Sequence, residues 1–545
     1  MHWALLLTAV TLAGAPPDPR LISVYPTTVK AGSTFAASVR GNAIAKCTGV
    51  HAPGAPLTFA VEGVSKDKSV DVVNLRITVK PGAKPGPYAL RLITANGVSN
   101  ALTLQVTDLT LIDEPAGTHE TPETAIAITS LPVVFNGKIG ERGESDYYSF
   151  QANAGDTLTF TAGSGLPAPG APGGNARGFD PSLTLYEPGS SWFEEKRWNR
   201  LAFNDEPLWV IGRNTDAALA YRFKKGGTYL LRVEAFSGQG GPDYGYQLMV
   251  RPGDTLPPSE AVSPEWEERS YTRRLSHDRM TEIAARGEAK KHAVIETYRT
   301  NLSLPGLLEG AIGEPGETHQ AKFHLPAPQD IAIEIETPES APPLFNPVVR
   351  LLNEKGEEVA TNIQAGRGAC TGALTKSLQP KVTVPLRDTG NYTVEVREVT
   401  ADLAGPQFRY RVLVRPQIPH IGQVRITEDH VNLYPGEAKT VRVVFDREED
   451  FRGALAVSVE GLPKGVEALA SADFEPDKDA PLSTGKRERY QPRTERTVVA
   501  FNAVDDAEIT QQPVTVRLVA RAIAGSKPGA IIARKEIPLM VVAKP

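Results

Sequence analysis

The sequence predicts an all-β fold of tandem β-sandwich domains, immunoglobulin-like and jelly-roll-like, with one short helical spacer. Valine- and threonine-rich runs alternate with turn residues along the chain, which contains 48 glycines and 45 prolines. This punctuation favours many short strands over helices. At 545 residues the chain is also too long for a single hydrophobic core. We therefore expect several consecutive sandwiches.

The first residues indicate an exported protein. Residues 1–15 are apolar, carry no charge and end in small residues, which is the pattern of a signal peptide. We therefore expect a secreted, periplasmic or cell-surface location. No later apolar run approaches the roughly 20 residues that cross a bilayer, so no transmembrane span is predicted.

Residues 20–108 predict the first sandwich. Alternating runs at 21–26 and 32–41 are expected strands, and Asn96 with Gly97 is a hairpin signal. The stretch resembles the IPT/TIG type of immunoglobulin-like domain, whose opening also has the order strand, proline, glycine, strand. The resemblance implies a small β-sandwich.

A β unit then occurs twice, in the predicted domains 109–253 and 301–418. The two copies share three anchors in the same order, and the intervals between the anchors differ in length. Anchors that persist while intervals vary are typical of strands joined by loops. The anchors pair as 137–150 with 310–323, 179–185 with 345–351, and 227–233 with 390–396.

The anchors of the first copy are Gly-Lys-Ile-Gly-Glu-Arg-Gly-Glu-Ser-Asp-Tyr-Tyr-Ser-Phe, Phe-Asp-Pro-Ser-Leu-Thr-Leu and Gly-Thr-Tyr-Leu-Leu-Arg-Val. They resemble the bacterial pre-peptidase C-terminal domain, in which Gly-x-Ile-x-x-x-Gly-Glu-x-Asp-x-Tyr-x-Phe, Asp-Pro-x-Leu-x-Leu and Gly-x-Tyr-x-x-x-Val recur. The second copy departs from this pattern, because His319 stands at the position of Asp146 and Asn346 at that of Asp180. The resemblance implies β-sandwiches that are non-catalytic modules of secreted peptidases and other exported proteins.

Two further segments complete the chain. Residues 254–300 are predicted as a helical spacer, because they lack β alternation and Ser263-Pro264 gives a helix start followed by acidic residues. Residues 419–545 are predicted as a final sandwich. Their turn Gly-Leu-Pro-Lys-Gly-Val at 461–466 resembles immunoglobulin-like domains of exported bacterial proteins.

The composition and motifs argue against several function classes. The net charge of −5 comes from mixed signs and provides no basic surface, so nucleic acid is not an expected partner. No His-Glu-x-x-His, Gly-x-Ser-x-Gly or phosphate-loop motif occurs. We therefore expect a protein that is not an enzyme.

The cysteines and histidines show no metal-binding pattern. Cys47 and Cys370 fall in different predicted domains, so we expect neither a disulfide nor a zinc site. His319 and His324 are five residues apart on a predicted strand, which places them on opposite faces. Both are expected to be solvent-exposed.

Acidic and amide residues of the first copy form a candidate calcium site. They lie at or near predicted strand ends, where hard oxygen ligands could converge. The alternative is that these side chains support turns by bonding nearby backbone amides. No other cofactor is expected. The candidate ligands are Asp146, Asp180, Asn204, Asp205 and Asp216.

Trp192, Trp198 and Trp209 are candidate ligand-binding residues. All the tryptophans of the predicted sandwiches fall in this one interval of the first copy. Aromatic side chains exposed on loops often bind sugar rings or protein surfaces. The alternative is that the three side chains pack within their own domain.

These features predict an exported, non-catalytic, multi-domain binding or adhesion protein that acts at the cell surface or on extracellular polymers. Its expected partner is an extracellular polysaccharide or a protein ligand such as a matrix protein. The competing hypothesis is a secreted hydrolase or an accessory subunit of a secreted peptidase, since the modules that the chain resembles usually accompany one.

Overall fold

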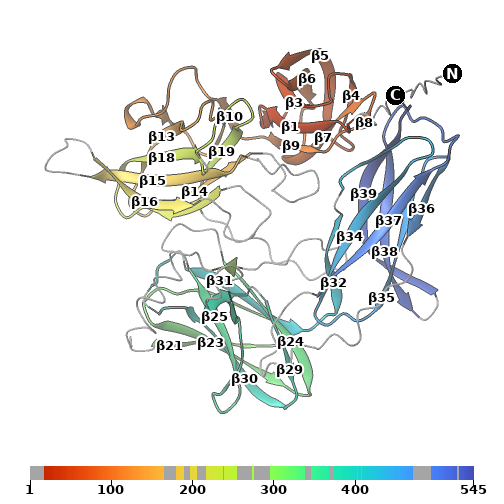
Figure 1. The fold of residues 1–545 in the computed structure, drawn as a ribbon. Helices are drawn as coiled ribbons and strands as arrows, with labels where there is room; N and C mark the ends of the chain where they lie inside the picture. Colours follow the sequence, from red (N-terminus) through yellow and green to blue (C-terminus); the bar gives the residue numbers. More distant parts are fainter. Residues whose placement is uncertain are drawn as a thin grey trace, which may run out of the picture.

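The computed structural model of the protein contains four β-sandwiches, which we call domains 1 to 4 in chain order (Figure 1). The described part holds no α-helix and a single 3₁₀ turn, η1 (Pro122–Thr124), so the predicted all-β fold of tandem sandwiches is confirmed there. Nothing helical in this part has the length and apolar character to span a bilayer. The structure describes residues 17–544 except 165–178, 190–196, 205–216, 237, 254–272, 275–294, 338–344, 368–373, 380, 402, 407, 427, 471–492 and 525–526.

Domain 1 consists of two facing sheets. The first has the order β1 (Arg20–Tyr25), β3 (Thr34–Asn42), β6 (Val70–Val79) and β5 (Leu57–Asp67). The second has the order β2 (Thr28–Lys30), β9 (Leu102–Thr107), β7 (Gly86–Thr94) and β4 (Cys47–His51), with β8 (Gly97–Val98) paired to β7.

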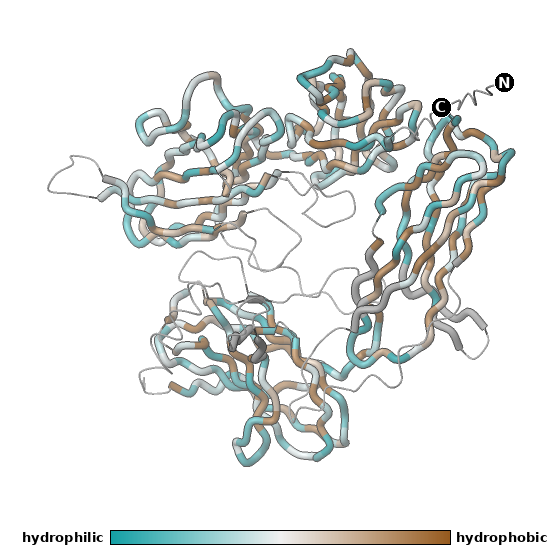
Figure 2. The backbone as a smooth tube through the Cα atoms, in the orientation of Figure 1, coloured by the Kyte–Doolittle hydropathy of each residue, from teal (hydrophilic) through white to brown (hydrophobic). Residues whose placement is uncertain are grey.

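Alternation along the strands explains how domain 1 forms. In β6, Val73, Leu75 and Ile77 are buried in the core, and the residues between them are exposed. Figure 2 shows hydrophobic residues following the strands of the sandwiches. Cys47 is a free thiol, whereas Cys370 lies outside the described residues, as does the predicted signal peptide 1–15.

Domain 2 has five strands in each sheet. One sheet has the order β11 (Ile126–Ala127), β13 (Ser145–Ala152), β18 (Gly227–Ala235), β15 (Pro181–Gly189) and β16 (Arg197–Asn204). The other has the order β10 (Thr110–Asp113), β12 (Val133–Lys138), β19 (Gly245–Pro252), β14 (Thr157–Gly163) and β17 (Ala217–Arg222).

Domain 3 repeats the strand order of domain 2, apart from the counterpart of β10. One sheet has the order β21 (Ile295–Leu302), β23 (Glu317–Leu325), β30 (Gly390–Glu398), β25 (Pro347–Leu352) and β26 (Glu358–Thr361). The other has the order β22 (Gly306–Ala311), β31 (Arg409–Pro416), β24 (Gln329–Glu336) and β29 (Lys381–Leu386). A small third sheet joins β20 (Arg273–Arg274), β28 (Leu374–Leu378) and β27 (Ile363–Arg367).

The opening glycine of each copy lies within a strand and opposite a buried tyrosine. Gly137 pairs with Tyr246, and Gly310 pairs with Tyr410. A Cβ atom on Gly137 would lie 2.3 Å from Cζ of Tyr246, and one on Gly310 would lie 2.8 Å from the Tyr410 hydroxyl oxygen. The motif glycine therefore leaves room for an aromatic ring that crosses the neighbouring strand.

The closing tyrosines of the two copies are also equivalent. The ring of Tyr229 stacks on Phe150 with a centroid separation of 6.0 Å, and that of Tyr392 stacks on Phe323 at 5.6 Å. Each tyrosine hydroxyl donates a hydrogen bond to the backbone carbonyl four residues earlier. The same local contacts therefore anchor the last motif strand in both domains.

Domain 4 is a sandwich of two four-stranded sheets. One has the order β32 (His420–Ile426), β34 (Ala438–Glu448), β37 (Arg493–Ala503) and β36 (Val466–Ala470). The other has the order β33 (Val431–Leu433), β39 (Lys527–Val541), β38 (Val514–Ala524) and β35 (Ala454–Glu460).

The helical spacer predicted for 254–300 is wrong where the structure describes it. Arg273–Arg274 form strand β20, and Ile295 to Thr300 belong to strand β21, which pairs in parallel with β23. The rest of the predicted spacer lies outside the described residues. The physical reason is that the β-branched and aromatic residues of β21 pair with β23 of the same domain. This pairing overrides the local sequence pattern.

Domain 2 holds domain 1 through a side-chain amide. Asn136 accepts a hydrogen bond from the Thr28 N–H at 3.0 Å and donates one to the Thr28 carbonyl at 2.9 Å. These are the two bonds that a neighbouring strand would supply. Asp243 of domain 2 accepts further bonds from Arg40 at 2.8 Å and from the Ser23 hydroxyl at 2.6 Å.

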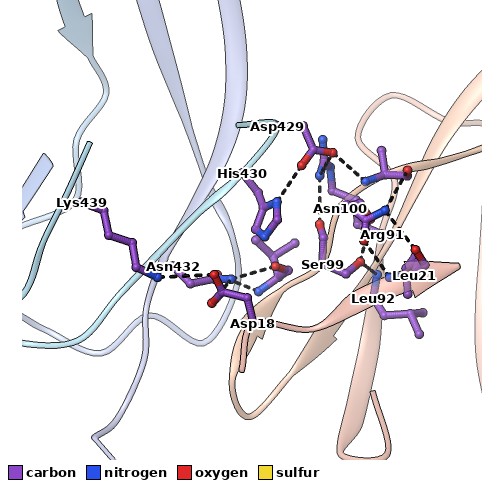
Figure 3. A network of polar contacts seen from close by, with 12 residues as sticks. Asp18, Leu21, Arg91, Leu92, Ser99, Asn100, Asp429, His430, Asn432 and Lys439 are labelled. Carbon is purple, nitrogen blue, oxygen red and sulfur yellow. Dashed lines mark hydrogen bonds and ion pairs between the residues drawn. The ribbon is translucent and has the colours of Figure 1, made fainter. Parts of the chain in front are cut away.

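Domain 4 holds the other side of domain 1 in the same way (Figure 3). Asn432 accepts from the Val98 N–H and donates to the Val98 carbonyl, both at 2.9 Å. Gly97 is needed beside it, because a Cβ atom there would lie 2.2 Å from Cγ of Asn432. Arg91 also pairs with Asp429 at 2.9 Å.

Domains 3 and 4 meet through buried charges. Lys381 donates to Glu448 and to Glu449 at 2.8 Å each, and Arg415 binds both carboxylate oxygens of Glu449 at 2.6 and 2.8 Å. Burial by itself would raise the pKa of Glu449, but the Arg415 hydrogen bonds and the Lys381 charge lower it to about 2. The domains therefore lie in the spatial order 2, 1, 4, 3 (Figure 1).

We expect Gly137→Ala to destabilise domain 2 by about 1–3 kcal/mol, because the added methyl group would overpack against the buried Tyr246 ring. Denaturant unfolding measures the loss. Gly226→Ala is the matched control, since its Cβ atom would find its nearest neighbour at 3.7 Å. Equal unfolding of the two variants would contradict the packing role of Gly137.

We expect Lys381→Met to open the contact between domains 3 and 4, because it leaves Glu448 and Glu449 buried with one cation fewer. The loss should be about 3–5 kcal/mol. Denaturant unfolding and the radius of gyration from small-angle scattering measure it. Arg387→Met, which removes an exposed pair with Asp330, is the control and should change neither quantity.

Candidate metal centre

Three carboxylates converge in domain 2 near its contact with domain 1. Glu114 directly follows β10, Glu144 directly precedes β13, and Asp146 lies on β13. One oxygen atom from each lies within 4.8 Å of the others. Parallel pairing of β10 with β12 brings Glu114 here from a distant part of the sequence.

Each carboxylate is anchored through one oxygen. Glu114 accepts from the Lys138 N–H at 2.8 Å, and Glu144 accepts from the Glu141 N–H at 2.6 Å. Asp146 accepts through Oδ2 from the Tyr246 hydroxyl at 2.5 Å. The backbone and one buried tyrosine therefore orient the three acids, and each retains a second oxygen.

The second oxygen of Asp146 is the unusual one. The side chain is 1% exposed, and Oδ1 has no hydrogen-bond partner among the described residues. Burial, reinforced by the charge of Glu114, raises the pKa of Asp146 to about 8. Burial also raises the pKa of Glu114. Such a group must bind either a proton or a cation at neutral pH.

The donor set fits a hard divalent cation such as calcium, because all its ligand atoms are carboxylate oxygens. Glu114, Glu144 and Asp146 would hold the ion. A second cluster, formed by His420, Glu448 and Glu449, does not fit, because Lys381 and Arg415 already neutralise its carboxylates.

At the equivalent position in domain 3, the chain itself provides a positive charge, the side chain of Arg299. His319 stands at the Asp146 position and bonds to the Tyr410 hydroxyl at 2.6 Å and to Glu317 at 2.6 Å. Arg299 lies 3.2 Å from the Glu317 carboxylate and 2.5 Å from His319. Domain 3 therefore replaces the three-carboxylate cluster with an internally paired one.

Burial lowers the pKa of His319, and the nearby Arg299 charge lowers it further, against the opposing effect of Glu317. The prediction that His319 is solvent-exposed is wrong, because its side chain is completely buried. The strand alternation does place His324 on the other, exposed face. The residues around His319 in the sequence do not show the side chains that stabilise it when it is buried. These are Arg299 on β21 and Tyr410 on β31.

Of the predicted calcium ligands, the three that the structure describes do not come together. Asp146 and Asn204 lie in one cross-strand row with Val233 and Leu183 between them, three strand spacings apart. That separation is about 14 Å, which is too far for one ion. Asp180 lies just past the same end of β18, where its carbonyl accepts from the Phe236 N–H at 2.8 Å, but it is two strands across from Asp146 and three residues farther along β18. Asp205 and Asp216 lie outside the described residues.

Sequence reasoning included Asp146 but missed its two partners. Glu144 could have been found, because residues two apart on a strand share a face. Glu114 carried no such signal. Its place depends on the strand pairing of β10.

The tryptophan interval is described only in part. Trp198 is half-buried on β16, where it pairs with Pro188 of β15. Trp192 and Trp209 lie outside the part that the structure describes. A ligand-binding role for the three tryptophans remains a prediction.

We expect calcium to raise the melting temperature at pH 8, since an ion bound only by the folded state stabilises it. Without the ion, the folded state keeps a proton on Asp146 up to pH about 8, whereas the unfolded carboxyl loses it near 3.8. Stability from this group therefore falls as pH rises between these values. Calorimetry in calcium and in chelator, at pH 5 and pH 8, measures both effects.

Asp146→Asn should abolish the calcium response and flatten the pH dependence, because the amide cannot ionise. Glu317→Gln, at the equivalent place in domain 3, is the control and should preserve the calcium response. Equal melting of the unsubstituted protein in calcium and in chelator would rule out the centre.

Comparisons with known proteins give only distant likenesses. No protein-family model and no curated protein matches this chain. The pre-peptidase C-terminal domain of a collagenase from Bacillus anthracis is 12% identical and covers 23% of this chain and 100% of its own, with a TM-score of 0.15. SGBP-B from a xyloglucan utilization locus in Bacteroides uniformis is 12% identical, with a TM-score of 0.14. The match covers 43% of this chain and 73% of that protein.

Tripeptidyl peptidase 2 is 10% identical and covers 97% of this chain, with a TM-score of 0.14. The present chain spans 40% of the length of that protein. TM-scores of this size carry no argument about family or function.

Proposed function

We propose that this chain is an exported, non-catalytic, multi-domain binding protein that acts at the cell surface or on extracellular polymers. Its partner is an extracellular polysaccharide or a protein ligand. The observation that carries the proposal is the fixed arrangement of the four sandwiches. Buried contacts join domain 1 to domains 2 and 4 and join domain 3 to domain 4.

A fixed arrangement suits binding because it presents surfaces without an ordering cost at the moment of association. Sandwiches joined only by flexible linkers would have to lose relative motion first. The asparagine contacts at Thr28 and Val98 are short-range and directional, so they define orientation as well as proximity. Calcium at Glu114, Glu144 and Asp146 would reinforce the end of domain 2 that meets domain 1.

One observation favours a second candidate, an accessory subunit of a secreted peptidase. The motifs of the first copy resemble a module that usually accompanies such enzymes, and in domain 2 their Gly137, Asp146 and Tyr148 all contact or face the buried Tyr246. A secreted hydrolase is the related alternative. Both differ from the main proposal in what a hydrolysis assay should detect.

We expect the purified chain to bind at least one ligand on glycan and matrix-protein arrays and to turn over no substrate on peptide and glycan hydrolysis panels. Trp192→Ala and Trp198→Ala, tested on the same arrays, report whether the tryptophan interval contributes. Turnover at enzyme-like rates would overturn the non-catalytic proposal. Stimulation of a secreted peptidase by an otherwise inactive chain would favour the accessory function.

A further inference from the structure

A groove with a volume of about 630 Å³ lies where domain 1 approaches domain 2. It forms because β1 ends at Tyr25, after which the chain crosses to the other sheet as β2. The pairing of β1 with β3 therefore stops at Tyr25 and Ser38. Residues 34–37 of β3 extend beyond that neighbour, and the space beside them is open.

Small side chains and two aromatic rings shape the groove. Ala36 and Ser38 lie on the outer face of β3 and form the floor of the groove. Their small side chains leave space above it. Tyr25 and Phe35 are half-buried at its edge. Lys138 of domain 2 lies 4.3 Å from the centroid of the Tyr25 ring and covers one of its faces. The contact with domain 2 therefore holds the ring in place.

The polar groups of the groove are suited to hydroxyl groups. Tyr25, Ser38 and Asn74 form one row across β1, β3 and β6. Glu62 and Asp113 add carboxylate acceptors from β5 and β10. The row supplies both donors and acceptors, and the carboxylates accept only.

The residues that line the groove offer no cationic partner to an acidic ligand. Among the described residues that line it, the charged ones are both acidic and neither lysine nor arginine occurs. On the same outer face of the sheet, Arg76 pairs with Glu62, and Arg40 pairs with Asp67 and Asp243. A phosphate, sulfate or uronate chain would find no lysine or arginine among these lining residues to pair with.

We propose that this groove binds a neutral oligosaccharide chain. Aromatic rings pack against the apolar faces of sugar rings, while amide, hydroxyl and carboxylate groups bind their hydroxyls. The inference rests on the proposed binding function and names a site and a ligand class for it. It is independent of the tryptophan interval, because the groove lies in domain 1 and at β10.

The test uses isothermal titration of the full chain with cellotetraose, xylotetraose, mannotetraose and maltotetraose. Oligogalacturonate and a lysine-rich peptide serve as charged competitors. Ala36→Trp fills the groove. Ala60→Trp is the matched control, because Ala60 lies in the same cross-strand row, is also exposed and does not line the groove. Asn74→Leu removes the amide without adding bulk.

We expect at least one neutral oligosaccharide to bind, Ala36→Trp to weaken it by tenfold or more, and Ala60→Trp to leave it within twofold. Asn74→Leu should weaken binding by about tenfold, as for one lost hydrogen bond. If Ala36→Trp lowers the melting temperature, the oligosaccharide affinity of Asn74→Leu tests the groove instead. Absence of binding to all four oligosaccharides, or tighter binding of either charged competitor, would overturn the proposal.

The array experiment distinguishes failure of the proposed binding function from failure of the groove as the binding site. If the unsubstituted chain binds nothing on the arrays, the proposed function fails. If an array ligand binds the unsubstituted chain and Ala36→Trp equally, the groove fails as its site and the binding function stands.

Discussion

Two buried asparagine side chains determine where domain 1 lies in the molecule. Asn136 from domain 2 and Asn432 from domain 4 each bond to both backbone groups of one domain 1 residue. Because Thr28 and Val98 are buried, loss of either amide would leave a backbone donor and acceptor without partners, at a cost of about 1–3 kcal/mol for each group. The groove depends on the first of these contacts, since it combines residues of domain 1 with Asp113 of domain 2.

The two copies of the repeated unit show how one buried position can be stabilised by different chemistry. In domain 2 an aspartate accepts from a tyrosine and stands beside two further acids, so it requires a proton or a cation from outside. In domain 3 a histidine occupies that position, and Arg299 provides a positive charge within the chain. Burial dominates both cases because it penalises an unpaired charge of either sign. The same sandwich can therefore carry a cluster of three carboxylates at this place or a cluster that is paired within the chain.

The strand pattern was predictable wherever alternation was local, and the errors occurred where distant partners decide. β21 follows a segment of helical composition, yet it forms a strand because β23 is available to pair with it. His319 was expected on the surface because its sequence neighbours do not reveal Tyr410 or Arg299 as partners. Asp146 lies in a carboxylate cluster with residues that were not predicted, whereas the predicted partner Asn204 lies across the same sheet. Register across strands, which no local pattern contains, separates true neighbours from residues of similar type.

The sequence by itself determined that this protein is a series of β-sandwiches and that one unit occurs twice, because glycine positions and the period-two pattern encode strands and turns locally. The tertiary structure alone decided which carboxylates converge, since Glu114 reaches Asp146 only through the pairing of β10 with β12. It also decided the spatial order of the domains, which differs from the chain order. The contacts that fix that order involve single side chains hundreds of residues apart, and such pairs leave no periodic trace in a sequence.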